Sequence, residues 1–89
     1  MEKTVLTEVR KQTERAITVA LARALPEQRD IAWQSVLTSE AGLDSVQIMN
    51  LVMEIEDELD LSVPVEMLAE VQTLEELAER LCRLQEDQT

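Results

Sequence analysis

Apolar residues recur with helical spacing along most of the chain. The first segment follows an i, i+3, i+4 pattern, with apolar residues at 5, 6, 9, 16, 17, 20, 21, 24 and 25. This spacing predicts a first helix with one apolar face. Thr4 is a candidate N-cap for it. Pro26 predicts its end, because proline lacks the amide hydrogen that a helix interior needs.

Further helices are predicted in the second half of the chain. One should run from Ser45 to Leu59, before Pro64 stops any continuation, and residues 65–70 should form a short helical turn. Thr73 begins a Thr-x-x-Glu capping box, which predicts a last helix. Its apolar side carries Leu74, Leu77, Leu81 and Leu84. No segment has a convincing strand pattern, so the sequence predicts an all-α bundle of three main helices and one short helix.

Residues 26–44 show no clean period and contain the only glycine of the chain, Gly42. They are predicted to form a long loop between the first and second helices. Apolar residues within it could pin it to the core, namely Ile31, Trp33, Val36 and Leu37. A loop of this length in a domain of 89 residues favours a functional role.

Composition narrows the classes of function. The formal net charge is −11, which argues against nucleic acids and anionic membranes as partners and favours basic protein surfaces. Residues 1–30 hold six basic and five acidic residues, a net of +1, whereas residues 31–89 hold two and fourteen, a net of −12. We therefore expect any electrostatic partner site in the second part of the chain.

The residue types that are absent from the sequence narrow the possible classes of function further. The chain has no histidine, so the usual Ser-His and Cys-His nucleophile pairs are excluded and the commonest metal ligand is absent. We expect no metal site and no catalytic residue. The single cysteine cannot form an internal disulfide, which fits a reducing cytoplasm. The first ten residues lack the apolar run of a signal peptide, and no segment is apolar enough to span a membrane.

The predicted second helix has two apolar sides. One broad face is expected in the core and carries Ile48, Leu51, Val52, Ile55 and Leu59. Nearly opposite lies a stripe expected to dock partner proteins, which carries Val46, Met49 and Met53, bordered by Glu56, Asp57 and Asp60. Methionines suit a surface that adapts to several partners. The alternative is that the two methionines pack against the long loop or the short helix.

The sequence Gly42-Leu43-Asp44-Ser45-Val46 precedes this helix. Glycine allows a tight turn, and either Asp44 or Ser45 could cap the first helical turn. Capping alone would explain Asp44. The hydroxyl of Ser45 would lie at the positive end of a helix, where a phosphodiester would be stabilised. Without histidine, something else would have to modify Ser45.

This motif, the acidic helix after it and Val63-Pro64 together resemble the acyl carrier protein family, which includes the peptidyl carrier proteins. The resemblance implies a four-helix bundle over residues 4–84, with tails at 1–3 and 85–89. It implies a 4'-phosphopantetheine arm on Ser45, which a phosphopantetheinyl transferase adds from coenzyme A with Mg²⁺, and Asp44 would help to place that metal. The carrier would then present acyl or aminoacyl thioesters to synthase and loading enzymes, as a monomer without catalysis of its own.

Departures from the family pattern favour a specialised member. Gln47 and Asn50 stand where many fatty-acid carriers have acidic residues, and Leu68 stands where they tend to have a small residue beside the acyl pocket. This favours polyketide or nonribosomal peptide synthesis over fatty-acid synthesis, and Met1 suggests a free-standing protein. Two alternatives stay open. The chain could be an unmodified acidic interaction module, such as an adaptor or anti-activator, or a small hydrolase or transferase using Ser45, against which the absence of histidine argues.

Overall fold

The computed structural model describes residues 2–28 and 31–87, with side chains described for residues 8–27 and 31–86. The helices are α1 (Glu2–Ala24), α2 (Ser45–Leu59), α3 (Val65–Glu70) and α4 (Leu74–Asp87), and a short 3-10 turn, η1 (Pro26–Gln28), follows α1. The described residues contain no strand. The predicted all-α fold of three main helices and one short helix is therefore confirmed.

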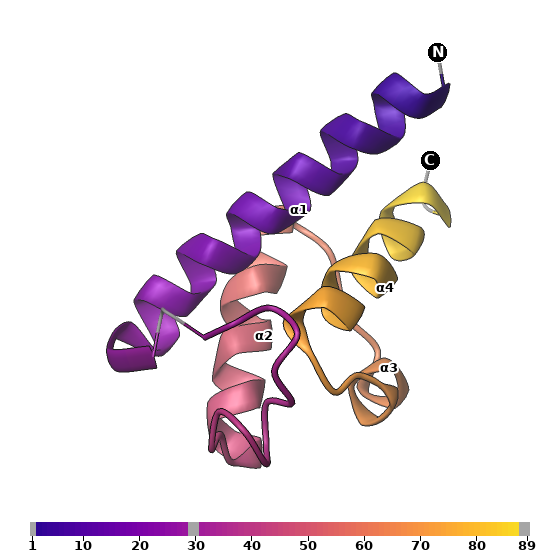
Figure 1. Ribbon diagram of the computed structural model, residues 1–89. Coiled ribbons are helices and arrows are strands. Elements are labelled where there is room, and N and C mark those ends of the chain that lie inside the picture. The colour runs from indigo at the N-terminus through magenta and orange to yellow at the C-terminus, as the bar shows by residue number, and fades with distance from the viewer. Residues whose placement is uncertain (1, 29–30, 88–89) are drawn as a thin grey trace.

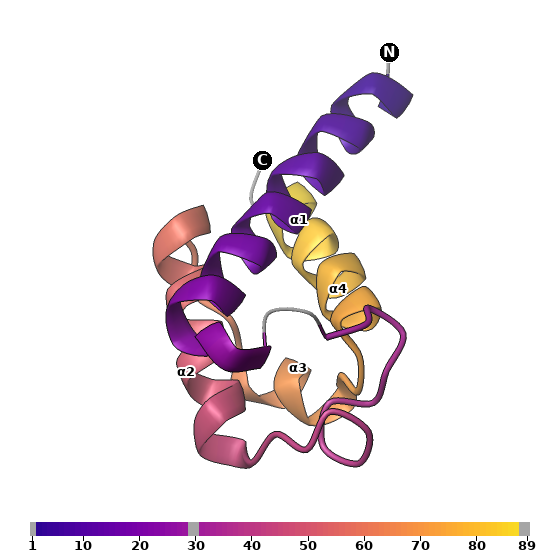
Figure 2. The same cartoon turned by 60° about the vertical axis from the view of Figure 1, so that its left-hand side comes forward.

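The longest helix organises the bundle. Figure 1 shows α1 running diagonally across the molecule, with α2 and α4 below it and both chain ends on the same side. Both α2 and α4 pack against α1. In the turned view of Figure 2, α2 and α4 lie on opposite sides of the molecule, and α3 lies between them at the end away from the termini. One face of α2 packs against α1, whereas its opposite face is exposed to solvent.

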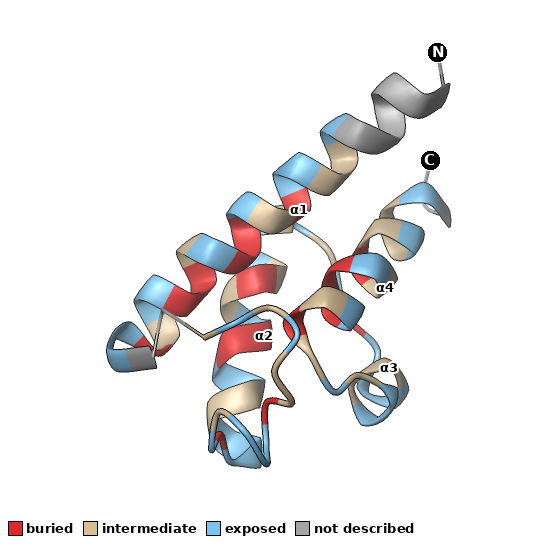
Figure 3. Cartoon of the chain, viewed as in Figure 1, coloured by how far each residue is buried: buried red, intermediate tan, exposed pale blue. Residues whose placement is uncertain are grey.

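The core between the three main helices is aliphatic. The buried positions of α1, α2 and α4 face one another, as Figure 3 shows. The most deeply buried large apolar side chains are Ile17, Leu51, Ile55, Leu74, Leu77 and Leu81. Burying one such side chain contributes about 1.5–3 kcal/mol to stability. Since α3 has no buried residue and only packs Met67 and Leu68 against this core, it is the least anchored helix.

One polar residue, Thr13, is fully buried among these described side chains. Its hydroxyl donates to the carbonyl oxygen of Val9 at 2.8 Å and accepts a hydrogen bond from the side-chain amide of Gln85 at 2.7 Å. The thiol of Cys82 lies 3.7 Å from the same oxygen. Because buried polar groups need partners, these contacts help to set the register of α1 against α4.

The helix boundaries agree with the sequence pattern at most places. The helix predicted from Ser45 to Leu59 and the short helix over 65–70 are observed as predicted, and α1 ends before Pro26. The N-cap assignment of Thr4 is wrong, because α1 already begins at Glu2. Glutamate and lysine are good helix formers, so the helix extends through the residues before Thr4. Helical structure also continues to Asp87, past the expected domain limit at residue 84.

The described part of the long loop is tied to Gln72, just before α4, and to the first turn of α4. The amide of Leu37 donates to the carbonyl oxygen of Gln72 at 2.8 Å, and the amide of Glu75 donates to that of Trp33 at 3.0 Å. Leu37 is buried, while Ile31 and Trp33 are half-buried against the core. The loop is thus held in place by backbone hydrogen bonds and by apolar contacts.

Hydrogen bonds of side chains fix the start of α4. Thr73 caps α4 as predicted, since its hydroxyl accepts from the amide of Glu76 at 3.1 Å. The carboxylate of Glu76 accepts from the amide of Gln72 at 3.3 Å.

None of the helices in the described part of the chain has the length and apolar character needed to cross a membrane.

The link between α2 and α3 depends on Glu56. Its carboxylate accepts a hydrogen bond from the amide of buried Val63 at 2.7 Å, and its carbonyl oxygen accepts from the amide of Leu61 at 3.2 Å. Asp60 ends α2 in the left-handed region, with φ of 52°. The side chain of Glu56 therefore holds the connection that leads to α3.

We predict that Glu56→Ala lowers the free energy of unfolding by about 1–3 kcal/mol, because the buried amide of Val63 loses its acceptor. Glu56→Gln keeps an acceptor oxygen and should lose less. The neighbouring exposed change Asp57→Asn should stay within about 0.5 kcal/mol of the parent. Urea unfolding followed by circular dichroism measures all three, and equal midpoints for Glu56→Ala and Asp57→Asn would contradict this role.

Candidate functional site

The candidate site begins with the turn at Gly42 and Leu43, which leads from the long loop into α2. Gly42 has φ of +74°, a conformation that side chains disfavour. Leu43 follows it with its side chain buried, and its amide donates to the carbonyl oxygen of Leu37 at 2.9 Å. This anchoring directs the chain from the loop into the first turn of α2.

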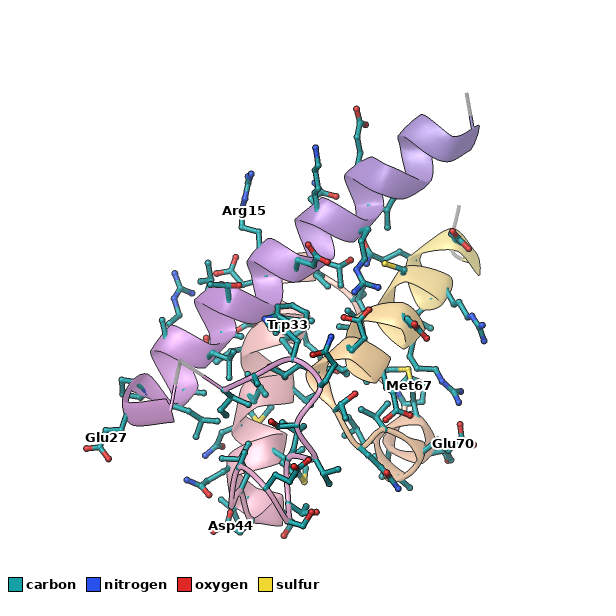
Figure 4. The ribbon with its side chains drawn as sticks, viewed as in Figure 1. Arg15, Glu27, Trp33, Asp44, Met67 and Glu70 are labelled. Atoms are coloured by element: carbon teal, nitrogen blue, oxygen red, sulfur yellow. The ribbon has the colours of Figure 1, made fainter. Side chains whose placement is uncertain are left out.

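Asp44 is the N-cap of α2. Its carboxylate accepts from the amide of Gln47 at 2.8 Å, and the side-chain oxygen of Gln47 accepts from the amide of Asp44 at 3.0 Å. This is a complete capping box. The sequence left Asp44 and Ser45 open as capping residues, and the structure selects Asp44. Figure 4 shows Asp44 at the lower end of the bundle, where α2 begins.

Ser45 is the first residue of α2, and it is exposed. In the first turn of a helix the amides have no intrahelical acceptor, and those of Ser45 and Val46 belong to this turn. The helix dipole adds a partial positive charge there. An oxygen-linked phosphodiester on Ser45 would therefore gain hydrogen-bond donors and a favourable field, while an attached chain could extend into solvent. The residues present fit such a group.

The carboxylate next to this serine, that of Asp44, is engaged in the capping box. The protein has no histidine, and within the described part of the chain no three potential metal-ligating side chains gather together. Ser45 is an exposed hydroxyl at the start of a capped helix, a position suited to receiving and holding a group.

The outer side of α2 is exposed as the spacing predicted. Val46, Met49 and Met53 retain 65%, 53% and 59% of their accessible surface. The opposite face supplies the buried residues Leu51, Val52 and Ile55, with Ile48 and Leu59 packed partly against the core. The alternative in which the two methionines are covered by the loop or by α3 is not what the structure has. Their use in docking stays a prediction.

The sequence analysis missed Val65. This residue is 72% exposed in the first turn of α3, next to Pro64. Its only signal was an apolar residue in a helix too short to show a period. Val65 adds an exposed apolar side chain outside α2.

The acidic residues of α2 do not share one environment. Glu54 and Glu58 lie 3.9 Å and 3.1 Å from the guanidinium of Arg23 on α1. Glu56 is engaged with Val63, as described above. Asp57 and Asp60 are exposed. Of the three acids predicted to steer partners, Glu56 has a structural contact that the sequence did not reveal.

A cavity lies between α2, α3 and the long loop. Its volume is about 260 Å³. Most of its lining is apolar and includes Leu37, Ile48, Val52, Leu68, Val71 and Leu77. Ser45, Ile48 and Val52 have i, i+3, i+7 spacing, so Ser45 lies on the same side of α2 as two of the residues that line the cavity.

Comparison with known proteins agrees with this geometry. The family described as "Phosphopantetheine attachment site" matches residues 15–81, which is most of the chain. A protein of Caulobacter vibrioides (strain NA1000 / CB15N) named "Probable acyl carrier protein" is 34% identical over 64 residues, covering 72% of this chain and 74% of that protein. No solved structure gives a significant match. The chain belongs to the acyl carrier protein family, whose members are carriers with a 4'-phosphopantetheine prosthetic group.

Proposed function

We propose that Ser45 carries the 4'-phosphopantetheine arm and that the protein holds acyl or aminoacyl intermediates on it for biosynthetic enzymes. One observation carries this proposal. Ser45 is an exposed hydroxyl at the first position of a capped helix, in a chain that matches the attachment-site family. Ser35, Ser39 and Ser62 lie outside any helix N-terminus.

Each residue of the site has a separate task in this proposal. Ser45 Oγ would lose its proton and form the bond to phosphorus, while the diphosphate bond of coenzyme A breaks and 3',5'-ADP leaves. The first-turn amides of Ser45 and Val46 would favour the negative phosphate. The capping box of Asp44 and Gln47 keeps the helix start rigid. When bound, the group supplies a terminal thiol that holds cargo as a thioester. Asp44, by family resemblance, also helps to place the Mg²⁺ of the transferase.

The protein is proposed to work without catalysis of its own. A phosphopantetheinyl transferase would load it, and loading and synthase enzymes would bind the outer side of α2. The single cysteine fits a cytoplasmic location. The neutral residues Gln47 and Asn50 support a specialised polyketide or nonribosomal pathway over fatty-acid synthesis. We propose residues 4–84 as the carrier domain and a monomer as the working form.

The unmodified adaptor is the competing function. It would use the same exposed α2 surface but would not be loaded. Intact mass after incubation with coenzyme A, Mg²⁺ and a broad-specificity transferase separates the two, because only a carrier gains the mass of one phosphopantetheine.

Ser45→Ala should abolish that mass gain completely. The fold should be unchanged, because Asp44 rather than Ser45 caps the helix and alanine at the first helical position changes stability by no more than about 0.5 kcal/mol. Peptide mapping of the loaded parent should place the group on the peptide that contains Ser45. Phosphopantetheine on any other residue would refute the assignment.

A further prediction concerns Asp44→Asn. Asparagine is as good an N-cap as aspartate, so the free energy of unfolding should change by less than about 0.5 kcal/mol. The loading rate should nevertheless fall about tenfold or more, because the carboxylate charge beside the transferase metal is lost. Parallel loading rates and urea midpoints test this. If Asp44→Asn instead lowers the free energy of unfolding enough to explain the slower loading, Asp44 acts only as the helix cap.

The cavity supports a further part of the proposal, namely that it receives the apolar part of the cargo. Leu68 forms one wall of it, and a smaller side chain there would leave more room. Leu68→Ala, loaded with acyl groups of increasing length, should shift the largest rise in melting temperature towards longer chains than in the parent. An identical chain-length profile in the two proteins would mean that the cargo stays outside.

A further inference from the structure

The exposed side of α1 carries charge of the opposite sign to the chain as a whole. Its exposed residues recur with i, i+3 and i+4 spacing and form one surface, the α1 basic face, which consists of Glu8, Lys11, Gln12, Arg15, Thr18 and Ala22. Two of these residues are basic and one is acidic, whereas the whole chain has a formal net charge of −11. Figure 4 shows Arg15 extending from α1 away from the bundle.

The two cations of this face form no ion pair with any described side chain. The other arginines of α1 are each paired with two glutamates, Arg10 with Glu14 and Glu75 and Arg23 with Glu54 and Glu58. Lys11 and Arg15 are four residues apart, so they are neighbours on the helix surface, about 6 Å apart along its axis. Both line an open depression of about 340 Å³. They are therefore available to carboxylates from outside the chain.

The bundle holds this face in a fixed position. The opposite side of α1 is buried at Thr13, Ile17 and Ala20, and α1 packs there against α2 and α4. The outer side of α2, where Met49 and Met53 are exposed, likewise lies opposite the side by which α2 packs against α1. The two exposed surfaces therefore face away from each other, and a partner on one leaves the other uncovered.

We infer that the α1 basic face is a second docking surface, and that its partner is a protein segment with carboxylates about 6 Å apart, as glutamates four residues apart on a helix provide. A guanidinium binds a carboxylate through two parallel hydrogen bonds, which suits Arg15 to this contact. The neutral residues Gln12 and Ala22 let the segment approach closely. A partner bound here could hold the carrier while Ser45 stays accessible on α2.

Acidic protein segments fit this face better than the other common polyanions. Basic clusters that bind anionic membranes hold roughly 4–8 lysines and arginines, and DNA-binding proteins typically neutralise about 6–10 phosphates. The α1 basic face offers two cations beside Glu8. Family membership does not account for it either, because Lys11 lies outside the stretch that matches the attachment-site family and Arg15 is the first residue of that stretch. The inference goes beyond the proposed function of Ser45 and does not depend on it.

The probe that tests it is a synthetic helical peptide with glutamate at every fourth position, and the same peptide with glutamine in those positions is its control. Binding is measured in about 0.15 M salt, where charges more than about 8 Å away are largely screened. Fluorescence anisotropy of the labelled peptide gives the affinity, and amide chemical shifts of the protein locate the contact. The glutamate peptide should shift amides within residues 8–22, and the glutamine peptide should not.

Two variants with the same change in net charge separate this face from the overall charge. Lys11→Gln with Arg15→Gln removes both cations of the face, and Arg83→Glu lowers the charge by the same two units on the exposed side of α4. The double variant should bind the glutamate peptide about 3- to 10-fold more weakly. Arg83→Glu should bind it as the parent does. Glu8→Gln, which removes the acid of the face, should bind it more tightly.

Several results would overturn the inference. These are no binding of the glutamate peptide by the parent, equal losses in the double variant and in Arg83→Glu, and chemical shift changes confined to α2 or α4. Binding to phosphatidylglycerol vesicles that the double variant loses would assign the face to a membrane instead. Slower loading of the double variant by the transferase would place this face within the transferase site. If the parent gains no phosphopantetheine, the proposed function of Ser45 fails, and the peptide measurements still decide whether the α1 basic face binds carboxylates.

Discussion

The packing of α1 against both α2 and α4 is the constraint on which the rest of the structure depends. Helix α1 supplies Ile17, Ala20 and Leu21 to the core, and both other main helices turn their buried faces towards it. Only the short helix α3 and the loop remain to cover other surfaces. The outer stripe of α2 therefore stays in water, although Val46, Met49 and Met53 are apolar. The exposure of the partner-binding candidates follows from the number of helices available.

A second, local constraint places the serine. The positive φ of Gly42, the burial of Leu43 and the reciprocal bonds of Asp44 and Gln47 fix the start of α2 over a few residues. Ser45 is consequently exposed yet attached to a rigid element. A carrier needs this combination, because its partners must find the attachment point in one orientation while the attached group moves freely.

Much of this could be predicted from the sequence, because helical periodicity and capping are local. The bounds of α2, the core side of that helix and its exposed stripe all followed from the spacing of residues such as Leu51 and Met53. Contacts that form where the chain folds back on itself could not be predicted in the same way. The bond from Val63 to Glu56 and the pairing of Arg23 with Glu58 depend on how the chain folds back, and nothing in the local pattern marks them. Buried Thr13 occupies a core position of α1 that a count of apolar residues passes over.

These contacts determine which of the acidic side chains behind the net charge are available to a partner. A value of −11 suggests a uniformly acidic surface, but on α2 the carboxylates divide into those that hold the fold and those that a partner can reach. Glu56 belongs to the first group, whereas Asp57, its neighbour in the sequence, belongs to the second. Exposed charges contribute little each, and flexible methionines adapt to different surfaces. Under the proposed function, in which several enzymes bind this side of α2 in turn, each partner would bind through weak contacts and could release the carrier to the next.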